Sequence, residues 1–281
     1  SFSGEGKLNM PDVIFEEIGP VQAQIPLVLS IPHSGTKVTE SFKQNCASPQ
    51  ILELPDTDWY VHHLYDFCTK LGIPAIRALY SRYIVDLNRP RPGTTPLYEK
   101  RSPTGLVPLR TFSQQSIYKQ AKEPSETEIE QRVEFFYDPY HRALYQALES
   151  CIKVHGIALL VDAHSIRSEV TSIQAEPFAD LILGNRSGKT CPMDFLVKAR
   201  EIFQSHDLTC ALNDPFQGGQ ITRHFHGAFE DIFCLQIEMS QRIYMDEESL
   251  QFPGEGWNKT RRALQEVIAF LGSEMSSRRL S

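Results

Sequence analysis

The sequence predicts an α/β fold with a mainly parallel or mixed central sheet flanked by helices. Short apolar runs alternate along the chain with longer segments of helical spacing, which is the order of strands joined by crossover helices. The runs at 27–31 and 157–161 are almost free of polar residues, as in strands covered on both faces. No shift in composition divides the 281 residues, so we expect residues 1–281 to form one domain.

The element boundaries follow from apolar spacing, caps and breakers. An arm or edge hairpin is expected at 1–25, and a loop that borders the active site at 90–110, which holds five prolines and two glycines. A polar loop is expected at 213–227. Pro139 should kink or split the long helix that a capping box opens at Ser125. Strands are expected at 27–31, 75–79, 83–87, 157–165, 180–184, 209–212 and 232–237, and helices at 59–68, 125–155, 193–206 and 258–271.

The composition disfavours nucleic-acid-binding and membrane proteins and indicates a compartment. The net charge of −7 and the pI near 5.7 disfavour nucleic acid as a partner, because nucleic-acid binding needs a basic face. No apolar run approaches 18 residues, so no membrane partner is expected. The six cysteines include no CxxC pair and no secretory segment opens the chain, which favours reduced thiols and the cytoplasm.

Two histidines each follow an apolar strand closely. His33 comes two residues after the 27–31 run and His164 three residues after the 157–161 run. Since the carboxyl ends of parallel strands meet at one edge of a sheet, we expect these side chains to share a metal ion.

A catalytic zinc site needs a third protein ligand. Asp58 is our choice, because it precedes the helix after the His33 loop, and Asp56 is the competing choice. Either aspartate could instead only cap that helix. Asp162 either points away from His164 or orients it from outside the metal site.

Further charged residues gather at the same edge. Glu238 ends the last apolar strand and is either a salt-bridge partner or a general base that deprotonates the attacking water. Arg82, Arg89 and Arg223 predict a small anionic substrate, because arginine pairs bidentately with carboxylates. Gly219, in the pair at 218–219, permits close approach of the backbone to a ligand.

Six motifs together resemble the N-formylglutamate amidohydrolase family over about residues 25–270. The run at 81–89 also resembles the substrate-binding run of aspartoacylases, in the wider zinc carboxypeptidase-like group. The motifs are Ile-Pro-His-Ser-Gly, Asp-Thr-Asp-Trp, Ser-Arg-Tyr-Ile-Val-Asp-Leu-Asn-Arg, Asp-Ala-His-Ser, Asn-Asp-Pro-Phe-Gln-Gly-Gly-Gln-Ile-Thr-Arg and Gln-Ile-Glu-Met-Ser.

The resemblance implies a phosphorylase/hydrolase-like fold and a zinc hydrolase that cleaves N-formyl-L-glutamate into formate and L-glutamate, a late step of bacterial histidine breakdown. It also implies roles for single residues. His33 and His164 would bind zinc, Glu238 would be the catalytic glutamate, Arg82 would polarise the scissile carbonyl, and Asn88 with Arg89 would clamp a substrate carboxylate.

One position departs from the wider group, which takes its first two metal ligands from His-x-x-Glu. Thr36 stands three residues after His33, and threonine is a poor zinc ligand, so the carboxylate must come from Asp58 or Asp56. Cobalt or iron would fit the same ligands. Two other functions stay open: hydrolysis of another N-acyl amino acid or a short acidic peptide, and metal-free binding of an amino acid.

Overall fold

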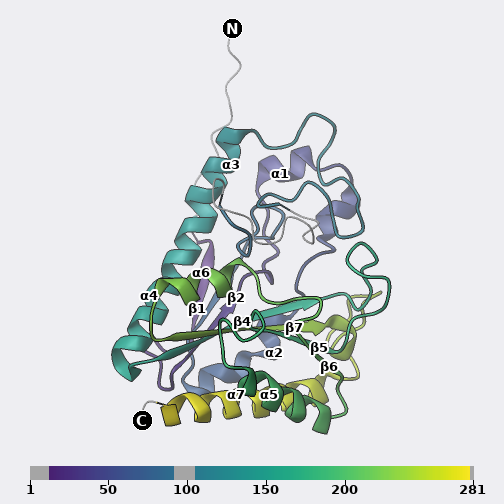
Figure 1. The fold of residues 1–281 in the computed structure, drawn as a ribbon. Helices are drawn as coiled ribbons and strands as arrows, with labels where there is room; N and C mark the ends of the chain where they lie inside the picture. The colour runs from purple at the N-terminus through teal and green to yellow at the C-terminus, as the bar shows by residue number, and fades with distance from the viewer. Residues whose placement is uncertain (1–12, 92–104, 279–281) are drawn as a thin grey trace.

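The computed structural model describes residues 13–91 and 105–278. Seven strands form one sheet in the order β1-β3-β2-β4-β7-β5-β6 (Figure 1). Residues 1–12 of the expected arm and 92–104 of the expected loop lie outside the described residues. The strands are β1 (Phe15–Ile18), β2 (Leu27–Ile31), β3 (Ala75–Ala78), β4 (Ala158–Ile166), β5 (Leu181–Gly184), β6 (Cys210–Leu212) and β7 (Ile232–Ser240).

The sheet is mixed, which confirms the predicted fold class. Strands β3, β2, β4 and β7 run parallel to one another, and β6 runs parallel to β5. The antiparallel pairs are β1 with β3 and β5 with β7. Strand β1 is one edge strand of the sheet and lies in the segment where the sequence predicts an arm or edge hairpin. The centre of the sheet is the β4–β7 pair, in register over nine residues.

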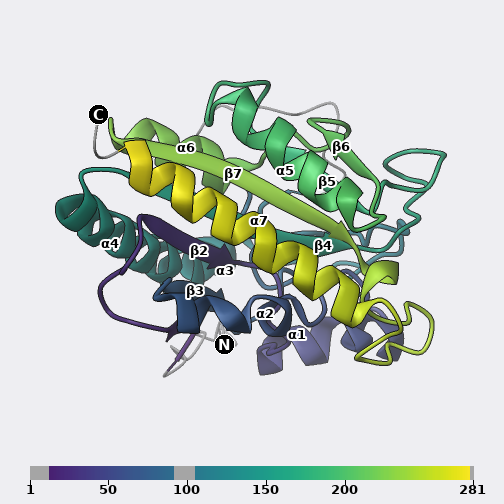
Figure 2. The same cartoon turned by 90° about the horizontal axis from the view of Figure 1, so that it is seen from below.

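Helices cover both faces of the sheet (Figures 1 and 2). Alternate residues of β2 and β4 divide between two cores, as the two-residue period of a strand requires. Leu29 and Val161 pack with α2, α5 and α7, whereas Val28 and Leu160 pack with α4 and α6. The helices are α1 (Glu40–Asn45), α2 (Val61–Leu64), α3 (Glu126–Arg132), α4 (Asp138–His155), α5 (Met193–Ser205), α6 (Gln220–Ala228) and α7 (Trp257–Arg278).

The sequence predicts a kink or a split at Pro139, and the structure has a π-helical turn just before this residue within a backbone that stays helical. Helix α3 ends at Arg132, a π-helical turn covers Val133–Tyr137, and α4 begins at Asp138 with the proline in its first turn. A proline is tolerated there because the first N–H groups of a helix have no intrahelical acceptor. The predicted helix at 59–68 is shorter than expected: α2 is followed by a 3₁₀ helix, Asp66–Leu71.

Two predicted elements are wrong. The expected strand at 83–87 is a buried run of turns with no sheet partner, because its apolar pattern reports burial and not a hydrogen-bonded ladder. The carboxyl half of the expected loop at 213–227 is helix α6, which buries only Ile221, Thr222 and Phe225. Too few apolar positions mark so short a helix in the sequence.

Backbone carbonyl groups of residues 81–89 accept hydrogen bonds from side chains of the α3–α4 segment. In a strand, a neighbouring strand would have supplied these donors. Arg132 donates to Ile84 O at 2.9 Å, His141 donates to Leu87 O at 2.8 Å, and the Tyr137 hydroxyl donates to Arg89 O at 2.9 Å. A buried carbonyl without a partner would be destabilising. These contacts therefore hold an irregular segment in a defined shape.

No helix in the described parts of the chain is both long and apolar enough to cross a bilayer. All six cysteines are free thiols, and burial raises the pKa of the Cys68 and Cys151 thiols to about 12.

We expect Arg132→Met to lower the free energy of unfolding. Arg132 is 1% exposed, pairs with Glu128 at 2.7 Å and donates to Tyr118 Oη at 2.8 Å. The variant leaves the Ile84 carbonyl and Glu128 unpaired, so a loss of roughly 2–4 kcal/mol is expected in urea denaturation. The control is Arg142→Met, at an exposed position of α4, which should change the free energy of unfolding by less than about 0.5 kcal/mol. Equal losses of stability in the two variants would contradict the role of Arg132.

Candidate active site

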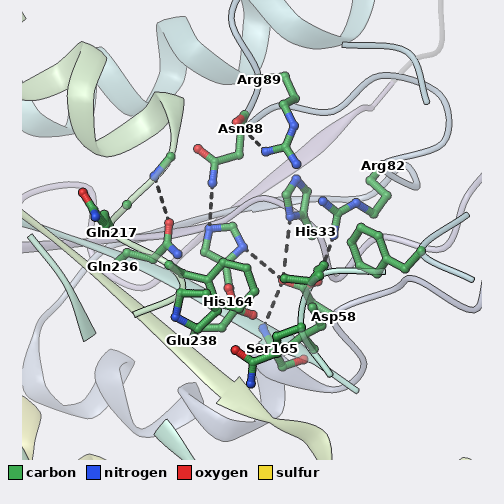
Figure 3. Close-up of a pocket in the computed structure, with 18 of the residues that line it drawn as sticks. His33, Asp58, Arg82, Asn88, Arg89, His164, Ser165, Gln217, Gln236 and Glu238 are labelled. Carbon is green, nitrogen blue, oxygen red and sulfur yellow. Dashed lines mark hydrogen bonds and ion pairs between the residues drawn. The ribbon is translucent and has the colours of Figure 1, made fainter. Parts of the chain in front are cut away.

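Three neighbouring parallel strands deliver the central side chains. His33 follows β2, His164 lies near the end of β4, and Glu238 lies opposite His164 in β7. The three side chains meet at the carboxyl edge of the sheet (Figure 3), where open α/β sheets bind ligands.

His33, Asp58 and His164 form a compact buried group. Their ligand atoms lie within 4.8 Å of one another, and the group could hold a metal ion. Asp58 Oδ2 lies 3.1 Å from His164 Nδ1 and 3.8 Å from His33 Nδ1. Of the two aspartates weighed from the sequence, the structure brings Asp58 to the histidines.

Each histidine is held from behind by a second carboxylate. His33 Nε2 donates to Asp86 Oδ1 at 2.7 Å, and His164 Nε2 donates to Asp162 Oδ2 at 2.8 Å. Asp162 therefore orients His164, and the alternative that it points away is wrong, because residues two apart in a strand share a face. Carboxylates in this position typically set the tautomer of metal-binding histidines.

This arrangement fits a cation. With Nε2 protonated, the Nδ1 atom of each ring presents a lone pair toward Asp58, and His33 Nδ1 has no hydrogen-bond partner within the described residues. His164 Nδ1 and the Asp58 carboxylate need a proton or a cation between them. Burial lowers the pKa of His33; burial also lowers that of His164, but Asp162 and Asp58 outweigh it and raise that pKa well above its usual value. A metal would displace that proton.

Backbone contacts on both sides of Asp58 fix its position. Gln241 Nε2 donates to Thr57 O at 2.9 Å, and the Tyr244 hydroxyl donates to Trp59 O at 2.7 Å. The Asp58 carboxylate also accepts from Ser165 N at 3.1 Å. The 57–59 turn is thereby fastened to the segment that follows β7.

Asp56 has a structural position. Its Oδ2 accepts from the Tyr83 hydroxyl at 2.7 Å and from Phe112 N at 2.8 Å. The Phe112 ring in turn lies 4.8 Å from the Arg82 guanidinium. Asp56 thus holds the aromatic wall beside Arg82 and does not face the histidines.

Arg82 is fixed by two carboxylates. Its Nη2 donates to Asp86 Oδ2 at 2.9 Å, and its Nη1 lies 3.5 Å from Asp58 Oδ1. The guanidinium therefore stands next to the histidine–aspartate group with a defined orientation (Figure 3).

Glu238 is a buried carboxyl group beside the same group. Burial raises its pKa to about 8; the Asp58 charge also raises this pKa, and His164 lowers it. A carboxyl group that titrates near neutrality can both accept and return a proton. A cation held by His33, Asp58 and His164 would lower that pKa again.

A cavity of about 600 Å³ is lined by His33, Asp58, Arg82, His164 and Glu238. Asn88, Arg89 and Gly219, which the sequence suggested for substrate binding, also line it. Arg223 is not among the lining residues; it lies in the first turn of α6, beside Gln220. The rest of the lining is Phe112, Ser165, Ile166, Ser172, Ile173, Gln174, Asp214, Pro215, Phe216, Gln217, Gly218 and Gln236.

Asp86 and Gln236 are among the residues of the site that were not predicted from the sequence. Asp86 lies in the run at 83–87 that resembled a strand, where its contact with His33 could not be inferred. Gln236 lies in the apolar run that precedes Glu238. A polar residue two positions before the predicted base, on the same face of a strand, is the signal that could have identified it.

The sequence matches proteins of one known family over most of its length. The family model of N-formylglutamate amidohydrolase matches residues 25–245. N-formylglutamate deformylase of Pseudomonas aeruginosa is 33% identical over 252 residues, which cover 89% of this chain and 94% of that protein. The deformylase of Pseudomonas putida is 34% identical over 80% of this chain and 84% of its own length.

The fold is shared as well. The crystal structure of an N-formylglutamate amidohydrolase from Ralstonia eutropha superposes with a TM-score of 0.81 at 26% identity, covering 95% of this chain and 99% of that one. The matched family model spans the segments that carry His33, Asp58, Arg82, His164 and Glu238. The chain belongs to the N-formylglutamate amidohydrolase family.

Proposed function

We propose that the protein is a zinc-dependent amidohydrolase that cleaves N-formyl-L-glutamate into formate and L-glutamate. The observation that carries the proposal is the convergence of His33, Asp58 and His164 beside Glu238 and Arg82 in one cavity. The family relatives named above are deformylases of the same substrate.

His33, Asp58 and His164 would hold the metal, which when bound supplies an acidified water molecule and a positive charge for the carbonyl oxygen. Cobalt or iron would fit the same donors.

The remaining steps fall to the chain's own side chains. Glu238 accepts a proton from the attacking water and passes it to the amide nitrogen as the bond to the formyl carbon breaks. The Arg82 guanidinium donates to the formyl oxygen, where negative charge develops in the transition state. The side-chain carboxylates of Asp58 and Asp86 hold this guanidinium in place.

Arginines orient the substrate. We assign Arg89, which lines the cavity, to one carboxylate of the glutamate part, with Asn88 as a further donor. We assign the other carboxylate to Arg223, which lies one helical turn from the lining residue Gly219. Fixing both carboxylates holds the formyl group in one attack geometry, which is the main contribution of binding to the rate. Free, buried cysteines support a reducing compartment, and we extend the proposal to a cytoplasmic enzyme of histidine breakdown.

The first test is release of formate from N-formyl-L-glutamate. We expect purified enzyme to release formate, chelator-stripped enzyme to lose that activity, and added zinc to restore it. Activity that survives complete removal of metal would contradict the metal role. No formate from zinc-loaded enzyme would overturn the substrate assignment, and turnover of other N-acyl amino acids or acidic peptides would then replace it.

The zinc affinity of two variants tests whether Asp58 or Asp56 is the metal ligand. We expect Asp58→Asn to weaken zinc binding by more than the roughly 10- to 100-fold that loss of a residue behind a ligand causes. Asp56→Asn keeps an oxygen for Tyr83 and Phe112 and should retain zinc. The measurement is competition against a chromogenic chelator, and the reverse pattern would make Asp56 the ligand.

Glu238→Gln should bind zinc normally but lose turnover by about 100- to 10,000-fold, the usual contribution of a general acid–base group. The substitution keeps the shape of the side chain and removes its ability to take a proton. Glu230→Gln, at an exposed position just before β7, should keep the parent kcat. Near-parental kcat in Glu238→Gln would remove Glu238 from the mechanism.

A further inference from the structure

Gln236 places an amide group in the cavity with a fixed orientation. It lies two residues before Glu238 in β7, so both side chains leave the strand on the same face, and it is 4% exposed. Gly219 N donates to Gln236 Oε1 at 3.0 Å. Because an N–H group can only donate, the amide oxygen must face Gly219, and the Nε2 group is turned away from it.

The Nε2 group has hydrogens to offer. Within residues 13–91 and 105–278, no atom accepts a hydrogen bond from it, and Gln236 lines the cavity beside Glu238 (Figure 3). Although the residue is largely buried, its Nε2 atom is open to the cavity and not sealed in the core, so a ligand or water can accept from it.

Asn88 is oriented in the same way. Ile221 N donates to Asn88 Oδ1 at 2.8 Å, which turns the Nδ2 group toward the cavity and to 3.3 Å from His164 Nε2. That ring nitrogen already donates its proton to Asp162, so it does not accept from Asn88. The Asn88 NH₂ group therefore also keeps hydrogens for a ligand.

Both amides are anchored on the beginning of α6, whose N-cap is Gly219. The first N–H groups of a helix carry partial positive charge and commonly bind anions. Here two of these N–H groups bind amide oxygens, and the amides turn their NH₂ groups into the cavity. A Cβ on residue 219 would lie 2.4 Å from Asn88 Nδ2, so glycine is needed to bring Asn88 this close to the helix.

We propose that Gln236 is a specificity-determining residue, and that its NH₂ group and that of Asn88 bind the two oxygens of one substrate carboxylate. A carboxamide in that place would turn its own NH₂ group toward one of these donors, so the pair selects the acid over the amide. This inference rests on the proposed deformylase function and adds a residue that selects the substrate.

The test is Gln236→Glu. The new carboxylate can still accept from Gly219 N, but it presents an acceptor where the NH₂ group was. The substituted site repels a carboxylate and accepts from a carboxamide. We would measure kcat/KM by formate release for N-formyl-L-glutamate, N-formyl-L-glutamine and the α-amide of N-formyl-L-glutamate.

We expect the acid-to-amide ratio to move at least about 100-fold toward one of the two amides, since sites built around hydrogen bonds discriminate this strongly. The ratio cancels any general effect of a new charge on Glu238. A shift toward the glutamine substrate assigns the pair to the side-chain carboxylate, and a shift toward the α-amide assigns it to the α-carboxylate.

Gln217→Glu is the matched control, because Gln217 also lines the cavity (Figure 3) but its side chain is not bonded to the start of α6. An unchanged ratio in Gln236→Glu, or an equal shift in Gln217→Glu, would overturn the proposal. If Gln236→Glu turns over no substrate, calorimetry of the binding of L-glutamate, L-glutamine and the α-amide of L-glutamate gives the corresponding acid-to-amide affinity ratios. Failure of the parent enzyme to release formate would instead refute the deformylase function.

Discussion

The site depends on one buried carboxylate, that of Asp86. Its Oδ1 accepts from His33 Nε2 at 2.7 Å and from Asn88 N at 2.9 Å, and its Oδ2 accepts from Arg82 Nη2 at 2.9 Å. Burial raises the pKa of Asp86, but His33 and Arg82 outweigh this and hold it well below its usual value. A fully buried charge is tolerated only with such partners. One carboxylate therefore fixes the proposed metal ligand His33, the proposed transition-state donor Arg82 and the proposed substrate-binding residue Asn88 relative to one another.

Asp86 lies on a segment that is not part of the sheet. Contacts with the helices must therefore hold this segment in place. The contacts of Arg132, Tyr137 and His141 with backbone carbonyls of 81–89 give this segment the rigidity that a ladder would have given a strand. A strand would have pointed Asp86 and Asn88 to the same face with regular spacing. The turns instead bring Arg82 and Asn88 to the cavity wall and leave Asp86 buried behind them, bonded to the Arg82 guanidinium and to Asn88 N.

The sequence predicted the parts of the site that follow from strand geometry. His33, His164 and Glu238 could be placed together because parallel strands bring their carboxyl ends to one edge. Asp58 and Asp56 could not be separated, since both lie in one turn whose shape depends on distant contacts from Gln241 and Tyr244. The run at 83–87 was mistaken for a strand because burial produces the same apolar pattern with or without a ladder.

Strand β7 holds Gln236 and Glu238 at a fixed separation. Leu235, Ile237 and Met239 face the core that contains α5 and α7, while Gln236 and Glu238 face the cavity. A strand rises about 3.3 Å per residue, so alternate side chains stand roughly 7 Å apart along it. Core packing on one face thus fixes the distance between Gln236, the proposed carboxylate-binding donor, and Glu238, the proposed general base, on the other face. A loop could not hold that distance, and a substrate whose carboxylate lies at another distance from its amide bond would not reach both groups.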